Sequence, residues 1–436
     1  MNGNYKTLMQ KVKENEELVG VLGLGYVGLP LAVEFALKSV NVLGFEKNEK
    51  KASNVNAGNN YIGDVVDSEL KQVTEKGYLK ATTDFSRLKE CDVILICVPT
   101  PLDIFQKPDM SFIQASCEDI AKYMKAGTFV SLESTTYPTT TEEFMLPILE
   151  KSGLKEGKDF WLVFSPERVD PGNDKYKTKN TPKVLGAISP EGVELGKMIY
   201  LKAVENICTV SSPRAAEMVK ILENTYRLVN ISLVNELALI CGKMNIDIWE
   251  VIEAAKTKPY GYQAFYPGPG IGGHCIPLDP FYLEYVAKKY HFDLTMIHTA
   301  GQINTLMPHK MMIKINSALN RQKKSLNGSK VLFLGVAYKA DINDERESPA
   351  LRLMDEVHNK GSFVSYYDPY ISAVTTEAGR IFNSIELSDS AIADADCVVF
   401  TTGHKAFNVK NIVEKAKLVV DLRNCVKSKH NNVVKL

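Results

Sequence analysis

The sequence predicts an α/β protein with two parallel-sheet units joined by a long central helix. In the first half, short apolar segments alternate with stretches of helical spacing, which is typical of a parallel sheet covered by helices. A second alternating block begins near Gly328. Between the two blocks, one stretch keeps helical spacing for longer than an ordinary domain needs.

Each expected strand is a short apolar run between helical stretches. The strands expected in the first block are Val19–Leu22, Val42–Phe45, Val93–Val98, Thr128–Leu132 and Trp161–Phe164. Those expected in the second block are Lys330–Leu334, Phe363–Tyr367, Cys397–Thr401 and Leu418–Asp421. Alternation of such strands with helices predicts parallel pairing within each block.

The central helix is predicted to begin at Ser212 and Pro213, an N-cap serine followed by proline at the first helical position. Apolar residues then recur with helical spacing at Met218, Leu222, Leu228, Leu233, Leu237 and Ile240. Further helical sequence follows from Ile246 to Lys256. A long, mostly apolar helix between two α/β units serves as a connector, a dimer interface, or both.

Composition excludes several classes of partner. The 436 residues contain 52 Lys plus Arg and 52 Asp plus Glu, so no global field attracts nucleic acid or an anionic membrane. No apolar run reaches the ~18 residues of a membrane span, and the polar N-terminal segment does not resemble a signal peptide. The eight cysteines form no C-x-x-C pair, which indicates reduced thiols and a cytoplasmic location. The seven histidines have no metal-ligand spacing, so no metal is expected.

A glycine-rich turn between the first strand and the next helix indicates a dinucleotide site. In the G-x-G-x-x-G pattern, Gly23 permits a tight turn, Gly25 lets the backbone approach a pyrophosphate, and Gly28 lets helix and strand pack closely. The helix N-terminus then offers N–H groups to phosphates. A glycine triplet of this kind also occurs where a helix and a strand simply pack closely. The surrounding residues must therefore decide whether it binds a dinucleotide.

The context favours NAD. Glu46 ends the next expected strand, where a carboxylate can accept from both ribose hydroxyls and would repel a 2′-phosphate. The neighbouring Lys47, Lys50 and Lys51 weaken this preference for NAD over NADP without reversing it.

The segment Tyr266–Pro280 is the candidate reaction centre. Four glycines in six residues, 268 to 273, form a loop whose backbone can press against a ligand. Near its end lie Cys275 and Asp279. A thiol beside bound nicotinamide can attack an aldehyde and pass from a thiohemiacetal to a thioester. The alternative is that Cys275 is a packing residue and Asp279 caps a helix, and His274 is expected only to hydrogen-bond locally.

Two further groups are candidates for the same chemistry. Lys220 and Asn224 lie one helical turn apart, where a cation and an amide could stabilise an oxyanion, although a solvated helix face is the simpler interpretation. Glu167 follows an expected strand in Ser-Pro-Glu-Arg, and without further context it is only a turn carboxylate.

Taken together, these residues resemble the nucleotide-sugar 6-dehydrogenases, the family of UDP-glucose, UDP-N-acetylhexosamine and GDP-mannose dehydrogenases. The resemblance runs through nearly the whole chain. The matching segments are Gly23–Pro30, Val98–Pro101, Ser134–Thr136, Ser165–Arg168, Lys220 with Asn224, Gly272–Cys275, Tyr338–Asp341 and Asp344–Pro349.

The resemblance implies two Rossmann-like domains with parallel sheets, joined by a long central helix and a helical dimerisation domain. The implied domains are an NAD-binding domain (1–210), a central dimerisation domain (211–315) and a nucleotide-sugar-binding domain (316–436). The implied partners are NAD, a UDP-sugar and a second copy of the chain, with surface-polysaccharide precursors as the product.

The resemblance also implies residue roles. Cys275 would be the nucleophile, and the implied supporting catalytic residues are Lys220, Asn224, Glu167, Asp279 and Thr135. The implied cofactor contacts are Gly23, Leu24, Gly25, Tyr26, Val27, Gly28, Glu46, Lys51, Pro99, Thr100, Thr135 and Arg346. The implied substrate contacts are Glu167, Arg168, Lys220, Asn224, Tyr266, Gly270, Gly272, Lys339 and Arg423.

Details of the resemblance favour UDP-N-acetylglucosamine as the substrate. Pro171 stands where the UDP-glucose members carry an acidic residue, and His274 and the Pro-Gly-Pro-Gly run resemble the N-acetylhexosamine branch. UDP-N-acetylmannosamine, UDP-N-acetylgalactosamine and UDP-glucose are the alternatives. A single-step hydroxyacid dehydrogenase would need neither the thiol nor a second nucleotide-binding domain, and a non-catalytic sensor would be expected to lose Cys275 or Lys220.

Overall fold

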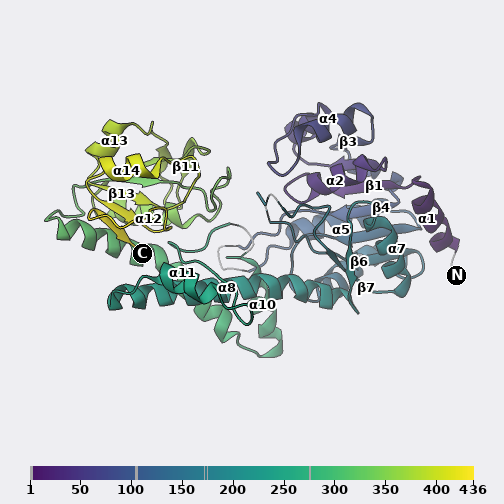
Figure 1. Ribbon diagram of the computed structural model, residues 1–436. Helices are drawn as coiled ribbons and strands as arrows, with labels where there is room; N and C mark the ends of the chain where they lie inside the picture. The colour runs from purple at the N-terminus through teal and green to yellow at the C-terminus, as the bar shows by residue number, and fades with distance from the viewer. Residues whose placement is uncertain (1–2, 104–106, 171, 174, 274–275) are drawn as a thin grey trace. The chain divides into compact units, whose positions relative to one another are not determined.

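The computed structural model describes residues 3–103, 107–170, 172–173, 175–273 and 276–436. The chain divides into two compact units, the first built from Met1–Glu223 with Phe281–His291 and the second from Asn224–Pro280 with Phe292–Leu436. Each unit contains its own sheet (Figure 1). The predicted α/β fold with two parallel-sheet units and a long central helix is confirmed.

The sheet of the first unit has eight strands in the order β3-β2-β1-β4-β5-β6-β7-β8. Its strands are β1 Leu18–Leu22, β2 Asn41–Phe45, β3 Leu79–Thr82, β4 Val93–Ile96, β5 Thr128–Leu132, β6 Phe160–Phe164, β7 Lys183–Ala187 and β8 Ile207–Thr209. Neighbouring strands run parallel except β6 and β7, which are antiparallel. Five of these strands were predicted, whereas β3, β7 and β8 were not.

Alternate strand residues of the first unit face two different helical layers. Val19 and Val21 of β1 belong to one apolar cluster, whereas Leu22 belongs to the other. The first cluster includes residues of α1 Gly3–Glu14, α2 Gly28–Leu37, α3 Glu49–Asn56, α4 Asp67–Glu75 and α7 Pro190–Tyr200. The second includes residues of α5 Ser111–Tyr123 and α6 Leu146–Leu149. The sheet is therefore covered on both faces, as its continuous apolar strands require.

The second unit contains a five-stranded parallel sheet in the order β10-β9-β13-β14-β15 and a small antiparallel hairpin. The sheet strands are β9 Lys330–Leu334, β10 Phe363–Tyr367, β13 Cys397–Phe400, β14 Val419–Asp421 and β15 Val433–Lys435, and the hairpin is β11 Ala373–Thr375 with β12 Ile381–Asn383. One face packs on α11 Thr295–Arg321 and α12 Pro349–Asn359, and the other on α13 Asp389–Asp394 and α14 Val409–Lys415.

The central helix α8 runs from Pro213 to Met244. The Ser212 hydroxyl accepts a hydrogen bond from the Ala215 N–H at 3.3 Å, as the predicted N-cap requires. Two shorter helices follow, α9 Ile248–Lys256 and α10 Asp279–Ala287. In the described part of the chain, no helix is both long and apolar enough to cross a bilayer.

Candidate functional site

The loop between β1 and α2 has the backbone that a pyrophosphate needs. Gly23 has φ +90°, and a Cβ there would lie 2.7 Å from the Cys97 carbonyl oxygen. A Cβ on Gly28 would lie 1.9 Å from the Gly23 carbonyl oxygen, so helix and turn approach too closely for any side chain. At Gly25 nothing lies within 4 Å of the Cβ position, which leaves the backbone open to a ligand.

Glu46 lies beside this loop, directly after β2. Its carboxylate accepts from the Leu24 N–H at 3.3 Å and from the Asn48 N–H at 3.1 Å. The Tyr61 hydroxyl donates to the Leu24 carbonyl at 2.7 Å, and the Lys51 ammonium lies 5.9 Å from the centre of the Tyr61 ring. A carboxylate held against the glycine turn can accept from ribose hydroxyls, so the residues of this loop fit NAD.

The ends of β4 and β5 are joined by hydroxyl groups. The Ser134 hydroxyl donates to the Val98 carbonyl at 2.6 Å, and the Thr100 hydroxyl donates to the Thr135 carbonyl at 2.8 Å. Thr135 itself is half-buried, and Pro99 is exposed. These bonds hold Thr135 at the carboxyl edge of the sheet, which is the edge where open α/β sheets bind ligands.

Glu167 lies at the same edge, after β6. Its Oε1 accepts from the N–H groups of Arg168 and Val169, at 2.7 and 2.8 Å. Its Oε2 accepts no hydrogen bond from any other residue that the structure describes. One oxygen therefore fixes the carboxylate, and the other remains available to a water molecule.

The Arg168 side chain joins this turn to the central helix. Its Nη2 lies 2.5 Å from the Glu223 Oε1, and its Nη1 donates to the Pro182 carbonyl at 2.6 Å. The guanidinium is therefore engaged by the protein itself, and it fixes the turn of Glu167 relative to α8.

A buried ion pair beneath these strand ends was not predicted. The Lys183 ammonium lies 2.5 Å from the Glu133 Oε2, and the two side chains are 6% and 0% exposed. Lys183 also donates to the Ser165 carbonyl at 3.3 Å, and the Glu167 N–H donates to the Glu133 carbonyl at 3.4 Å. Burial raises the pKa of Glu133, against the lowering effect of Lys183. The pair thus supports the segments that carry Thr135 and Glu167.

Helix α8 brings two charged side chains to this region. Glu217 is fully buried and accepts from the N–H groups of Thr139 and Thr141, at 2.7 and 2.9 Å, and from the Thr141 hydroxyl at 2.7 Å. Burial raises the pKa of Glu217 to about 7 despite these donors. These bonds join α8 to the segment that follows Thr135.

Lys220 lies one turn further along α8 and is only 8% exposed. Across the residues that the structure describes, no side chain or carbonyl accepts a hydrogen bond from its ammonium. A buried cation without a protein partner is uncommon, and it suits an anionic ligand or transition state. The interpretation of Lys220 as part of a solvated helix face is therefore wrong.

The amide of Asn224 contacts the end of the candidate reaction loop. Its Nδ2 donates to the Asp279 Oδ2 at 2.6 Å, and both side chains are buried. Asp279 is the first residue of α10 and follows Cys275 by four positions. Cys275 and His274 lie outside the described residues, as does Pro171. The solvated-face interpretation is also wrong for Asn224.

The glycine loop before Cys275 packs against the loop that follows β9. A Cβ on Gly272 would lie 2.7 Å from the Tyr338 Cβ, and a Cβ on Gly270 would lie 3.0 Å from the Pro349 Cβ. Gly273 has φ +83° and donates its N–H to the Arg346 carbonyl at 2.9 Å. The glycines thus permit a close approach between two loops of the second unit.

Arg423, after β14, covers the start of the same glycine loop. A Cβ on Gly268 would lie 2.2 Å from the Arg423 Nη1, and the Gly268 N–H donates to the Asn235 side chain at 2.9 Å. Within the described ranges, no carboxylate forms an ion pair with the Arg423 guanidinium. Burial lowers the pKa of Arg423, so an anion at this position would relieve a desolvated cation.

The remaining predicted contacts of the second unit have protein partners. The Arg346 guanidinium binds the Asp344 carboxylate through Nε and Nη2, the latter at 2.6 Å from the Asp344 Oδ2. The Tyr266 hydroxyl donates to the Glu253 carboxylate at 2.8 Å, and its ring stacks on Trp249 at 6.0 Å. Lys339 is half-buried in the loop after β9. None of the described residues forms a cluster that could hold a metal ion.

The predicted residues therefore divide between the units. The first unit carries the glycine turn, Glu46, Thr135, Glu167 and Lys220, and the second carries Asn224, Asp279, the glycine loop, Lys339, Arg346 and Arg423. A dinucleotide loop in one unit, and a buried Arg423 beside a glycine loop in the other, are the features expected of a dehydrogenase whose substrate carries a nucleotide.

Comparison with known proteins gives the family. Three domain profiles of the UDP-glucose/GDP-mannose dehydrogenase family match: its NAD binding domain at residues 17–204, its central domain at 214–306 and its UDP binding domain at 332–428. The chain belongs to this family and is an NAD-dependent oxidoreductase acting on a nucleotide sugar.

Named relatives align along almost the whole chain. The UDP-N-acetyl-D-mannosamine dehydrogenase of Pyrococcus horikoshii is 34% identical, covering 94% of this chain and 96% of that protein. The UDP-N-acetyl-D-glucosamine 6-dehydrogenase of Pseudomonas aeruginosa is 33% identical, with 93% and 96% covered. The solved structure of the P. horikoshii enzyme is similar with a TM-score of 0.87, covering 96% of this chain and 98% of that one.

Proposed function

We propose that this enzyme oxidises C6 of UDP-N-acetylglucosamine from the alcohol to the carboxylate, in two successive two-electron steps. The observation that carries the proposal is the buried hydrogen bond between Asn224 and Asp279, because it ties the residue four positions after Cys275 to the central helix. The N-acetylhexosamine branch is supported by relatives that are named for such sugars. The P. horikoshii relative makes UDP-N-acetylmannosamine the second candidate.

The first oxidation converts the C6 alcohol to an aldehyde. NAD, when bound at residues 23–28, supplies the oxidant. Two NAD molecules are used in turn, and each accepts one hydride, that is, two electrons and one proton. The ammonium of Lys220 and the amide of Asn224 stabilise the developing alkoxide. The hydroxyl proton leaves through water that Asn224 and Asp279 orient.

Covalent capture then prevents loss of the aldehyde. The thiolate sulfur of Cys275 bonds to C6, and the carbonyl oxygen becomes an alkoxide held by Lys220. Loss of two further electrons and a proton from C6 converts this thiohemiacetal into a thioester.

Hydrolysis completes the reaction. Glu167 removes a proton from water through its available Oε2, and the water oxygen attacks C6. The C–S bond breaks, the sulfur leaves as a thiolate, and the product is the UDP-uronate. Thr135 orients this water or the sugar, and Lys339 and Arg423 bind the diphosphate. Arg346 is assigned to the NAD phosphates, as the family resemblance implies.

Steady-state assays of NADH formation test the substrate and the chemistry. UDP-N-acetylglucosamine is expected to give the highest kcat/KM among the three UDP-N-acetylhexosamines and UDP-glucose, with two NADH per sugar. Cys275→Ser is expected to stall this four-electron turnover, whereas Cys208→Ser, which changes an exposed cysteine, serves as the matched control. Preferred turnover of UDP-glucose, or full turnover by Cys275→Ser, would contradict the proposal.

We further propose that α8 forms a homodimer interface with a second copy of the chain. Leu233, Leu237, Ile240 and Met244 recur at intervals of four, three and four residues, and each is between 43% and 60% exposed. An apolar stripe of this spacing matches a second helix with the same stripe. Light scattering tests this proposal: Leu237→Glu is expected to give monomers, and a dimer unaffected by that change would refute it.

A further inference from the structure

The loop after β9 has no regular secondary structure to fix it, yet it carries Lys339. Residues 335–348 connect β9 to α12 without helix or strand. Asp341 within the loop has φ +63°, a left-handed conformation that a residue with a side chain adopts only at a cost. The position of Lys339 therefore depends on tertiary contacts at both ends of the segment 336–341.

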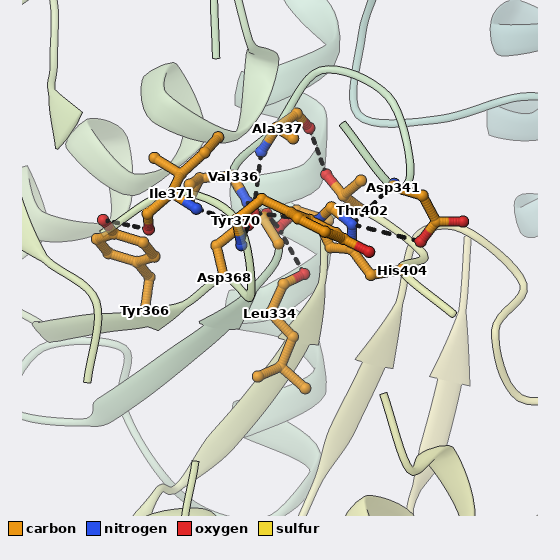
Figure 2. A network of polar contacts seen from close by, with 12 residues as sticks. Leu334, Val336, Ala337, Asp341, Tyr366, Asp368, Tyr370, Ile371, Thr402 and His404 are labelled. Atoms are coloured by element: carbon orange, nitrogen blue, oxygen red, sulfur yellow. Dashed lines mark hydrogen bonds and ion pairs between the residues drawn. The ribbon is translucent and has the colours of Figure 1, made fainter. Parts of the chain in front are cut away.

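Asp368 holds the first end of this segment (Figure 2). It directly follows β10 and is 4% exposed. Its Oδ2 accepts from the N–H groups of Val336 and Ala337, at 2.7 and 3.2 Å. Its Oδ1 accepts from the N–H groups of Tyr370 and Ile371, at 2.9 and 3.2 Å. Burial alone would raise the pKa of Asp368, but His404 and these N–H groups hold it below its usual value.

His404 holds the second end. It lies beyond β13, is 3% exposed, and its Nδ1 accepts from the Asp341 N–H at 3.0 Å. A nitrogen that accepts from a backbone N–H carries no proton, so the proton of the neutral ring is on Nε2. Nε2 lies 3.0 Å from the Asp368 Oδ2 and donates to it. The imidazole therefore links the Asp368 carboxylate, which binds the backbone N–H groups of residues 336 and 337, to the backbone N–H of residue 341.

Two neighbouring contacts support the same geometry. The Thr402 hydroxyl donates to the Ala337 carbonyl at 2.6 Å, and the Lys405 N–H donates to the Asp341 carboxylate at 2.8 Å. Figure 2 shows Asp368, which follows β10, and Thr402 and His404, which both follow β13, grouped around Val336, Ala337 and Asp341 of the loop. Lys339 lies midway between the two tied ends, two residues from each.

We propose that Asp368 and His404 are positioning residues that hold Lys339 where it binds the nucleotide diphosphate. This inference rests on the proposed role of Lys339. If His404 only filled the core, its volume and its hydrogen bond to Asp368 would be sufficient. A positioning histidine needs in addition the acceptor at Nδ1, because that acceptor binds the Asp341 N–H, two residues beyond Lys339.

Two amide substitutions separate these roles. Asn places an oxygen near the position of Nδ1, so His404→Asn keeps the acceptor for the Asp341 N–H and loses the bond to Asp368. Gln reaches the position of Nε2, so His404→Gln keeps the donor to Asp368 and loses the acceptor. Calorimetric titration of the full-length proteins with UDP tests this. Relative to wild type, UDP is expected to bind about tenfold more weakly to His404→Gln and at most about threefold more weakly to His404→Asn.

Controls locate the effect at the diphosphate. Uridine, which has no phosphates, should bind equally to the wild type, His404→Gln and His404→Asn, and the KM for NAD should be the same in all three. Lys339→Ala should weaken UDP binding, and adding His404→Gln to it should weaken binding less than twofold further.

The outcomes separate the two hypotheses. Loss of uridine and UDP binding in equal measure, or a Gln variant that binds UDP as tightly as the Asn variant, would overturn the positioning role while leaving the role of Lys339 intact. UDP binding unaffected by Lys339→Ala would overturn both, although oxidation of a UDP-sugar would still stand. Should His404→Gln not fold, Asp368→Asn alone and combined with Lys339→Ala provides the comparison, because an amide has only one acceptor oxygen for the four N–H groups that the Asp368 carboxylate binds. Asp368→Asn is expected to weaken UDP binding but not uridine binding, and unchanged UDP binding would overturn the positioning role.

Discussion

Lys183→Met tests whether the buried ion pair supports the N-terminal unit. Methionine preserves much of the lysine stem but leaves the Glu133 carboxylate, which is 0% exposed, without its cation. Removing one partner of a buried ion pair typically destabilises a protein by about 3–5 kcal/mol. At about 2–4 °C per kcal/mol for a domain of this size, the melting temperature should fall by roughly 6–20 °C.

The loss of stability in Lys183→Met should depend on pH. Burial raises the pKa of Glu133 in the folded state, and Lys183 opposes that increase. Without Lys183 the folded-state pKa rises further, so the stability associated with protonated Glu133 is present at low pH and is lost as pH rises through the folded-state pKa. The deficit relative to wild type should therefore be larger at pH 8 than at pH 5.

Urea and thermal unfolding of the full chain provide the measurements. Glu133→Gln combined with Lys183→Met removes the unpaired charge and should recover part of the stability. Lys197→Met, at an exposed lysine of α7, is the matched control and should change stability by no more than about 0.5 kcal/mol. A Lys183→Met protein within about 1 kcal/mol of wild type at pH 8 would refute the claim that this pair is isolated from water.

Three further changes probe the site. Glu217→Gln should flatten the pH dependence of stability, because the wild-type contribution is present below about pH 4.5 and lost as pH rises through about 7; unfolding measured from pH 5 to 8 checks this. Gly28→Ala should destabilise the fold by about 1–3 kcal/mol and raise the KM for NAD, since the new Cβ would meet the Gly23 carbonyl at 1.9 Å; calorimetry and initial rates check both. Arg168→Lys should lower kcat more than it raises the KM for the UDP-sugar, because lysine cannot reproduce the paired contacts with Glu223; a change confined to KM would contradict this role.

The sequence predicted the elements whose signal is local. Central strands such as β1 and β5 are short runs of apolar residues, so both their existence and their bounds follow from composition. The edge strand β3 is half exposed and begins Leu-Lys, and β7 begins with Lys183, whose burial depends on Glu133. Such strands are defined by their neighbours in the sheet, which no window of sequence contains.

The residues of the candidate site also divide into those that local sequence reveals and those that depend on distant parts of the chain. Glycines 23, 25 and 28 are recognisable because their spacing follows from one turn of backbone. Glu133 with Lys183, and Asp368 with His404, are joined across 50 and 36 positions, and neither pair has a spacing rule. The available signal was weak: in both pairs the carboxylate comes directly after a strand, at the edge where parallel sheets bind ligands.

The first unit is not one continuous piece of sequence. After residue 223 the chain leaves it and then returns with residues 281–291, where the Tyr282 hydroxyl donates to the Thr100 carbonyl and Tyr282 and Val286 pack with Tyr137 and Ile221. A fragment truncated near residue 210 would therefore lack part of its own core. Chimaeras that exchange nucleotide specificity between relatives should keep the return segment from the same parent as the cofactor half, and join the parents beyond α11.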